Sequence, residues 1–283
     1  MLKISTLSFP GLGIGEFEVN SVAFTLFGEH PIAWYAIIIT FGMILAVAYV
    51  IFRAGRIGIK SDDILDFAIF VIPFGIIGAR LYYVLTTLEN YHSLSEVFDI
   101  RSGGLAIYGG IIAGAATVYV VCRVKKIYFP AFGDCVVPGV ILAQSIGRWG
   151  NFMNAEAHGY ETDIFCRMGI GSGDNAIFYH PTFLYESLWN IIGFIAINFF
   201  YKHKKYDGQI ILMIFGWYGL GRFWIEGMRT DSLYIPGTEL RISQVLAALI
   251  FVACLAALIY FAIKPPKREL YTYVKTKNEK TGK

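Results

Sequence analysis

Residues 147–159 read Gly-Arg-Trp-Gly-Asn-Phe-Met-Asn-Ala-Glu-Ala-His-Gly and follow directly on an apolar run that begins near Cys135. This continuity places Arg148 inside or at the rim of a predicted membrane span. A guanidinium at that depth costs roughly 2.5–3.5 kcal/mol on insertion scales, so an anionic partner or a functional role is expected for it. Gln144, one helical turn earlier, carries no charge, and the nearest acid along the stretch is Glu156. The sequence therefore predicts an arginine that serves a ligand rather than a local ion pair.

Other polar groups surround this arginine in the same stretch. A helix that turns by about 100° per residue brings Arg148, Asn151 and Gly159 to one side, with Asn154 and Glu156 beside them. One guanidinium, two carboxamides and one carboxylate would then face a common space, and the glycines would leave room for a ligand to approach. The pattern predicts a polar binding site within the membrane domain.

The composition is typical of a polytopic membrane protein. Of the 283 residues, 56% are hydrophobic and 16% are charged, and the mean hydropathy is +0.56. The cysteines are scattered, with neither a Cys-x-x-Cys pair nor a Cys/His cluster, so they are predicted to be packing residues rather than metal ligands or a disulfide framework. They are Cys122, Cys135, Cys166 and Cys254.

Apolar runs of roughly 17–22 residues predict an all-α polytopic membrane protein with about seven transmembrane helices. The predicted spans cover residues 33–52, 64–86, 104–122, 134–152, 181–201, 208–227 and 242–263. Pro73 and Pro138 interrupt two of these spans, which is tolerated where neighbouring helices satisfy the freed backbone groups. Residues 1–32 are expected to form an irregular or short-strand segment outside the membrane. Residues 153–180 are expected to form a small external cap on a single membrane domain, residues 33–263.

The basic residues are distributed unevenly between the two sides of the predicted spans. Sixteen lysines and arginines fall on one side and five on the other. Cytoplasmic loops carry the excess of positive charge, so the N-terminus is predicted to lie outside and the C-terminus in the cytoplasm. The basic tail, residues 264–283, is then expected to lie against the anionic inner leaflet.

This topology brings charged side chains to one depth. Arg80, Arg148 and Arg222 each fall late in a span that runs outward, so all three are expected in the outer half of the bilayer. Tyr108, His180 and Glu186 fall near the starts of spans that run inward, at the same level. Several guanidinium groups at one depth suit a phosphate, which they hold through charge-assisted hydrogen bonds. The alternative, that such charges only neutralise one another, applies to Arg222 with Glu226 and to Arg80 with a facing carboxylate. Arg222 and Glu226 share a helical stripe with Tyr218 and Arg229.

The stretch 147–159 resembles, position for position, the Gly-Arg-x-Gly-Asn-Phe-x-Asn-x-Glu-x-x-Gly signature of the prolipoprotein diacylglyceryl transferases, which are bacterial inner-membrane enzymes. The resemblance extends from about residue 30 to about residue 263. It includes Trp34-Tyr35, Arg80, the glycine-rich segment 103–114, His180-Pro181, Leu184-Tyr185-Glu186, Arg222 and Glu226.

The resemblance implies an enzyme of the bacterial plasma membrane that transfers a diacylglyceryl group from phosphatidylglycerol to the thiol of the lipobox cysteine of a prolipoprotein, releasing glycerol phosphate. It implies neither a cofactor or metal nor a nucleic-acid partner. The residues expected to bind phosphatidylglycerol are Arg148, Asn151, Asn154, Gly159, Tyr35, Arg80, Arg222 and His180. The residues expected to act in catalysis are Arg148, Arg222, Glu156, Tyr108 and Glu226.

The base that removes the thiol proton is left open by the sequence. Glu156, Tyr108 and Glu226 are the candidates. Members of the family often carry a histidine at the position of Tyr108, so a mechanism in which a histidine is the obligatory base here is in doubt. A transporter or receptor with an anion site near the outer leaflet is the rival hypothesis, since intramembrane arginines and broken helices suit it too. The signature at 147–159 argues against that rival.

Overall fold

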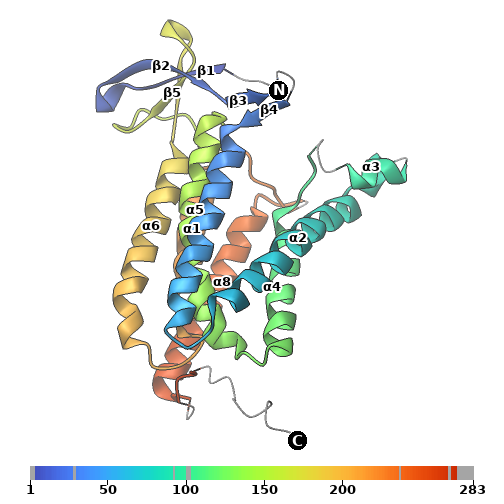
Figure 1. Cartoon of the computed structure of the whole chain (residues 1–283). Helices are drawn as coiled ribbons and strands as arrows, with labels where there is room; N and C mark the ends of the chain where they lie inside the picture. Colours follow the sequence, from blue (N-terminus) through green and yellow to red (C-terminus); the bar gives the residue numbers. More distant parts are fainter. Residues whose placement is uncertain are drawn as a thin grey trace, which may run out of the picture. The chain divides into compact units, whose positions relative to one another are not determined.

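The computed structural model describes residues 4–27, 30–91, 93–99, 103–235, 237–266 and 269–272. The predicted basic tail, residues 264–283, therefore lies largely outside the described residues. Long helices dominate the described part of the chain (Figure 1). They are α1 Trp34–Gly55, α2 Ser61–Thr86, α4 Ile107–Val124, α5 Phe129–Met153, α6 Thr182–Phe200, α7 Gln209–Met228 and α8 Ile242–Ile263.

The helices confirm a mostly helical, multi-pass membrane protein. Among the described residues, six of these helices are long and apolar enough to cross a membrane. The seven long helices of the described residues fit the prediction of about seven spans, and one of them is less apolar than the other six. The helix left out is α7, because Arg222, Glu226 and several glycine and aromatic residues lower its hydropathy. The helices α2 and α5 continue through Pro73 and Pro138, as expected where other elements satisfy the backbone.

The chain divides into two compact units, and each is described by itself. Unit 1 comprises residues 1–48 and 136–270, and unit 2 comprises residues 49–135 and 271–283. In unit 2, α2 packs on α4 at two glycines: a Cβ atom on Gly109 would lie 2.2 Å from the carbonyl oxygen of Gly78. Gly110 lies on the same contact, where a Cβ atom would be 3.4 Å from the carbonyl oxygen of Gly75. Short elements between the helices are η2 Leu88–Asn90 and α3 Leu94–Phe98.

Unit 1 carries a small β sheet, called the cap sheet, and its first strands lie in the N-terminal segment for which an irregular or short-strand structure was expected. The strands β1 Ile4–Phe9, β2 Ile14–Asn20, β5 Met168–Ile170 and β6 Ile177–Tyr179 form an antiparallel sheet in the order β2-β1-β5-β6. The strands β3 Val22–Leu26 and β4 His30–Ala33 form a separate hairpin that leads into α1. The remaining short turns are η1 Pro10–Leu12, η3 Gly173–Asn175 and η4 Tyr201–His203.

The cap sheet packs directly on the signature stretch. Leu7 and Val19 form a buried cluster with Ala155, against which Phe152 and Met153 are partly buried. Phe152 also lies beside a second cluster, which includes Phe183 in the first turn of α6. Burial of apolar side chains from the two strands and from the end of α5 thus fixes the polar residues that follow Met153.

Reciprocal contacts hold α6 between α5 and α7. Ser145 of α5 and Ser187 of α6 each donate to the other's carbonyl oxygen, at 2.8 and 2.9 Å. The indole of Trp189 donates to the carbonyl of Trp217 at 3.0 Å, and Trp217 returns a bond of 2.9 Å to Trp189. Their rings stack with centroids 4.2 Å apart. These pairs set the rotation of α6, and they leave Glu186 facing both neighbouring helices.

Candidate functional site

Three charged side chains from three helices form the centre of the site. Arg148 Nη2 of α5 lies 2.5 Å from Glu186 Oε1 of α6. Arg222 Nη1 of α7 lies 3.2 Å from the other oxygen, Glu186 Oε2. The Glu186 side chain is 4% exposed, whereas the two arginine side chains are 19% and 16% exposed. The structure therefore brings Arg148 and Arg222 together, as the topology argument predicted, but through a carboxylate on α6.

Glu226 adds a second buried carboxylate to this centre. Its Oε2 atom lies 2.5 Å from Arg222 Nη2, one turn earlier on α7. The contact is an ion pair that is not aligned as a hydrogen bond. The predicted pairing of Arg222 with Glu226 is confirmed, and each guanidinium of the centre still has donors not used by Glu186. On the same helical stripe, Tyr218 hydrogen-bonds the side chain of Gln144 on α5.

The carboxamides lie on the other side of Arg148. Asn151 Oδ1 accepts a bond of 3.2 Å from Arg148 Nη1. The Nδ2 groups of Asn151 and Asn154 both donate to Glu156 Oε1, at 3.0 and 3.1 Å. Glu156 itself is exposed. A hydrogen-bonded chain thus runs from Glu186 through Arg148 and Asn151 to an accessible carboxylate.

The helix ends earlier than the sequence argument assumed. α5 stops at Met153, and Ala155 and Ala157 take the left-handed conformation, with φ of 48° and 55°. Such values are uncommon for a residue with a side chain. Gly159 therefore does not share a helical face with Arg148. Instead the chain turns back after Met153, which is how Glu156 comes to face Asn151.

Gly159 allows a close approach of three backbone segments. Its N–H donates to the carbonyl of His180 at 2.9 Å, and it forms a bridge with Arg229 at the end of α7. A Cβ atom at this position would lie 2.7 Å from His180 Cβ and 2.8 Å from the carbonyl oxygen of Met228. The signature glycine is therefore a packing requirement that joins the cap to α6 and α7.

His180 and Tyr35 lie at the edge of this arrangement. His180 Nδ1 lies 3.2 Å from the hydroxyl of Tyr185, and burial lowers the pKa of the His180 ring. Its ring is therefore neutral at pH 7 and acts as a hydrogen-bonding group rather than a cation. The Tyr35 ring covers Gly150 of α5, where a Cβ atom would lie 2.6 Å from Tyr35 Cδ2. Tyr35 is thus placed on the helix that carries Arg148.

Arg80 and Tyr108 belong to unit 2, so their participation in the same site stays a prediction. The Arg80 guanidinium donates to backbone carbonyls of the segment between α2 and α4. The acceptors are Glu96 O at 2.6 Å, Gly103 O at 2.7 Å, Val97 O at 2.8 Å and Gly104 O at 3.0 Å. Arg80 thereby fastens this segment to α2. Tyr108 lies half-buried in the first turn of α4.

Two residues near the centre were not assigned a role from the sequence. The signal for Glu186 was available, because a carboxylate within an apolar span is as costly as an arginine there. Arg241 gave no such signal, since a cation just before a span is ordinary. In the structure it is 7% exposed and donates to the backbone carbonyl of Glu226 and to the hydroxyl of Tyr160.

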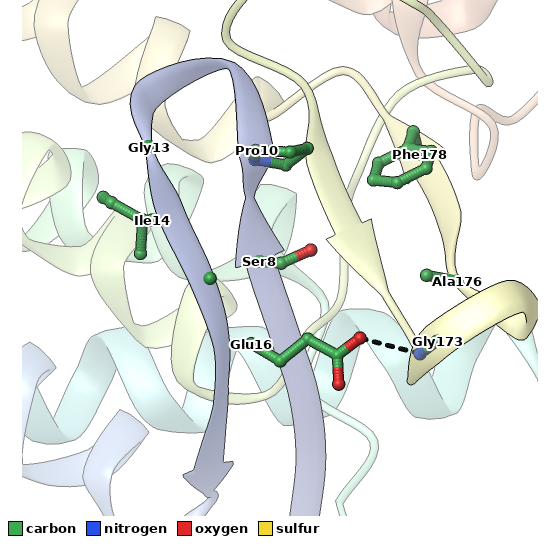
Figure 2. A pocket seen from close by; sticks show the side chains of 9 residues that line it. Ser8, Pro10, Gly13, Ile14, Glu16, Gly173, Ala176 and Phe178 are labelled. Carbon is green, nitrogen blue, oxygen red and sulfur yellow. Dashed lines mark hydrogen bonds between the residues drawn. The ribbon is translucent and has the colours of Figure 1, made fainter.

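The cap sheet also bears an open hollow of about 410 Å³ (Figure 2). One of its walls is set by Glu16, whose Oε1 accepts a bond of 2.7 Å from the N–H of Gly173. None of the residues predicted from the sequence to act in catalysis or lipid binding lines it. The lining residues are Ser8, Pro10, Gly13, Ile14, Gly15, Glu16, Gly173, Ala176 and Phe178.

Comparison with known proteins identifies the family of the chain. Residues 21–260 match the family model described as prolipoprotein diacylglyceryl transferase. The chain is 44% identical over 247 residues to a phosphatidylglycerol–prolipoprotein diacylglyceryl transferase of Clostridioides difficile, covering 87% of this chain and 97% of that protein. It is 43% identical over 279 residues to the enzyme of the same name from Enterococcus faecalis, covering 93% of this chain and 98% of that one. The chain therefore belongs to the prolipoprotein diacylglyceryl transferase family.

Proposed function

We propose that this protein transfers the diacylglyceryl group of phosphatidylglycerol to the cysteine thiol of a prolipoprotein. The observation that carries the proposal is the pair of guanidiniums, Arg148 and Arg222, held on one buried carboxylate beside the family signature. The family membership supports the same substrates, because the relatives bear them in their names.

The reaction is a displacement at the glyceryl carbon that bears the phosphate. The thiol loses its proton to a base, and the sulfur attacks that carbon. A C–S bond forms as the C–O bond breaks, and the electron pair of the broken bond leaves with the phosphate as glycerol phosphate. Because negative charge grows on the phosphoryl oxygens, cations placed beforehand at those oxygens lower the barrier. Arg148 and Arg222 supply these cations.

Among the candidate bases, Glu156 fits the base role better than Glu226. Glu226 is ion-paired with Arg222 and its side chain is 2% exposed, whereas Glu156 is exposed and bound only through Oε1 by two carboxamides. An exposed carboxylate can pass the proton on to water. A tyrosine free in water loses its proton only near pH ~10, so we assign Tyr108 a hydrogen-bonding role.

The excess of basic residues on one side of the spans supports an orientation with the cap outside and the loops near residues 55, 125 and 203 in the cytoplasm. The site then lies in the outer half of a bacterial plasma membrane. This is where a translocated acceptor cysteine meets phosphatidylglycerol.

Mass spectrometry of an acceptor peptide tests the activity. Purified protein is incubated with phosphatidylglycerol and a peptide that contains a lipobox cysteine, and a diacylglyceryl adduct on that cysteine is expected. A peptide with serine in place of the cysteine, and vesicles of phosphatidylethanolamine alone, are the controls. Binding of phosphatidylglycerol without any adduct would favour the rival class, a transporter or receptor with an anion site.

A further inference from the structure

Two side chains from the start of α8 bind the backbone of the last two turns of α7. Arg241, the residue before α8, donates to the carbonyl oxygen of Glu226. Gln244 Nε2 donates to the carbonyl oxygen of Phe223 at 3.0 Å. A carbonyl near the end of a helix often needs a donor from outside the helix. The start of α8 therefore adds donors at the end of α7, where the Glu226 carbonyl also accepts the Arg229 N–H at 3.2 Å, and this segment carries the side chains of Arg222 and Glu226.

Arg241 also ties this segment to the cap. Its guanidinium donates to the hydroxyl of Tyr160 and lies over the rings of Tyr160 and Tyr234, 5.6 and 5.7 Å from their centroids. The Tyr160 N–H donates to the carbonyl of Met228 at 2.9 Å, beside the bridge that joins Gly159 to Arg229. One buried guanidinium therefore connects the end of α7, the start of α8 and the signature stretch.

The charge of Arg241 is not placed there to neutralise an acid. The ion pairs found among the described residues involve Arg222 and Arg229 in this region, but not Arg241. A buried cation is costly unless its donors are satisfied. The Arg241 guanidinium is satisfied by a carbonyl, a hydroxyl and two aromatic faces. An apolar residue would fill the same space without that cost. We therefore infer that the guanidinium serves to orient the segments that it bonds.

We propose that Arg241 is a positioning residue for the transfer reaction, acting through the backbone of Glu226 to hold Arg222 and Glu226 toward Glu186. This inference rests on the proposed function. Rotation of the last two turns of α7 would move the Arg222 guanidinium away from the position of the leaving phosphate. A misplacement of about 1 Å in a catalytic group can cost about 10²-fold in rate. The loss is therefore expected in kcat, the step in which charge develops on the phosphate.

Arg241→Met and Arg241→Lys test the proposal, with Arg167→Met as the matched control. Arg167 makes contacts of the same kind on the cap. Its Nη1 donates to the carbonyls of Asp163 and Ile164 at 3.0 and 3.4 Å, and its guanidinium lies 4.9 Å from the Phe178 centroid. Arg241→Met keeps the aliphatic stem and loses every donor. Arg241→Lys keeps the charge and three N–H donors on one nitrogen, but it loses the planar fork that reaches the two acceptors from separate nitrogens.

The expected result is a fall in kcat per folded molecule of about tenfold or more for Arg241→Met, with the KM for phosphatidylglycerol changed less than about threefold. Arg241→Lys should recover part of the loss, and Arg167→Met should keep wild-type kcat. Normal kcat in the folded Arg241→Met protein, with only its yield or melting temperature reduced, overturns the proposal. So does an equal loss in Arg167→Met.

Hydrogen exchange gives a readout that does not depend on activity. Amides of residues 222–228 should exchange faster in Arg241→Met than in the wild type, and at the wild-type rate in Arg167→Met. Unchanged exchange in Arg241→Met overturns the proposal. If Arg241→Met does not fold, Tyr160→Phe and Gln244→Ala remove one partner each, and faster exchange at 222–228 is expected for both. A wild-type protein that forms no adduct contradicts the proposed function, while the exchange experiment still decides the role of Arg241.

Discussion

Arg148 and Arg222 bind opposite oxygens of one carboxylate, Glu186, at 2.5 and 3.2 Å. They come from α5 and α7, and the shared acid comes from the helix between them. Burying each guanidinium costs desolvation free energy. The shared carboxylate offsets part of that cost and holds both guanidiniums in place. On the proposed function, the phosphate of the lipid meets two cations whose orientation is already fixed, rather than two flexible side chains that must be ordered during binding.

Glu186→Gln is expected to lower kcat more than it affects lipid affinity. The amide keeps one acceptor but turns an N–H donor toward the second guanidinium, so one charge-assisted bond is lost. A bond of that kind is worth about 1.5–3 kcal/mol, or roughly 10–100-fold in rate. The KM for phosphatidylglycerol should fall or stay constant, because a competing anion is removed. Steady-state kinetics measure both, with Glu18→Gln on the exposed face of β2 as the control. Wild-type kcat in Glu186→Gln would show that the shared carboxylate does not orient the site.

Arg148→Lys is expected to reduce transfer by about 10²–10³-fold per folded molecule, as for the loss of one strong contact to a developing anion. Lysine keeps the charge but cannot bind Asn151 and Glu186 with the planar fork of arginine. Arg148 was predicted to have no carboxylate partner in its own helix. It does pair with a carboxylate of another helix, Glu186 of α6. Activity and phosphatidylglycerol binding should be measured together. Near-normal specific activity would remove Arg148 from the phosphate site.

Tyr108→Phe is expected to retain measurable transfer activity. A tyrosine free in water loses its proton only near pH ~10, so its phenol is a poor base at neutral pH. Loss of a hydrogen bond to a substrate costs about 0.5–1.5 kcal/mol, which corresponds to roughly 2–10-fold in rate. Rates should be followed across the pH range in protein of confirmed fold. A folded variant that binds lipid but transfers nothing at any pH would make Tyr108 the proton acceptor.

Stability is expected to fall as the pH is lowered from 7 toward 5, in part through His180. Burial lowers the pKa of this ring below its ordinary value of 6.5. The unfolded chain therefore takes up the proton first, so this contribution is present above pH 6.5 and is lost as the pH falls through the native pKa. His180→Asn should show a shallower decline in melting temperature over this range. Parallel curves for the variant and the wild type would argue against a buried neutral His180.

Single-cysteine labelling tests the proposed orientation. In a background free of the four native cysteines, Phe165→Cys on the cap should react with an impermeant reagent added to intact cells, and His203→Cys after α6 should not. Both sites are exposed, with Phe165 at 71%, so a difference in labelling reports the side of the membrane. The opposite pattern would overturn the topology and the outer-leaflet site together.

The sequence by itself determined the membrane class, most helix positions and the family signature. These features are local: a span must be about 20 apolar residues long, and an arginine within it is visible because it is costly there. Arg148 and Arg222, which were predicted to lie close together, do meet at Glu186. The ion pair between Arg222 and Glu226 was predictable because the two residues lie one helical turn apart.

Only the tertiary structure decided which charges meet across helices. The contact of Glu186 with both arginines depends on the rotation of α6, which paired serines and tryptophans fix from neighbouring helices. The cap sheet pairs β1 with β5, strands that are far apart in the sequence. The left-handed residues after Met153 turn Glu156 back toward Asn151. Arg241 gained its place from the packing of α8 on α7. All four features depend on contacts between segments that are distant in the chain. Residue patterns within one segment do not encode such contacts.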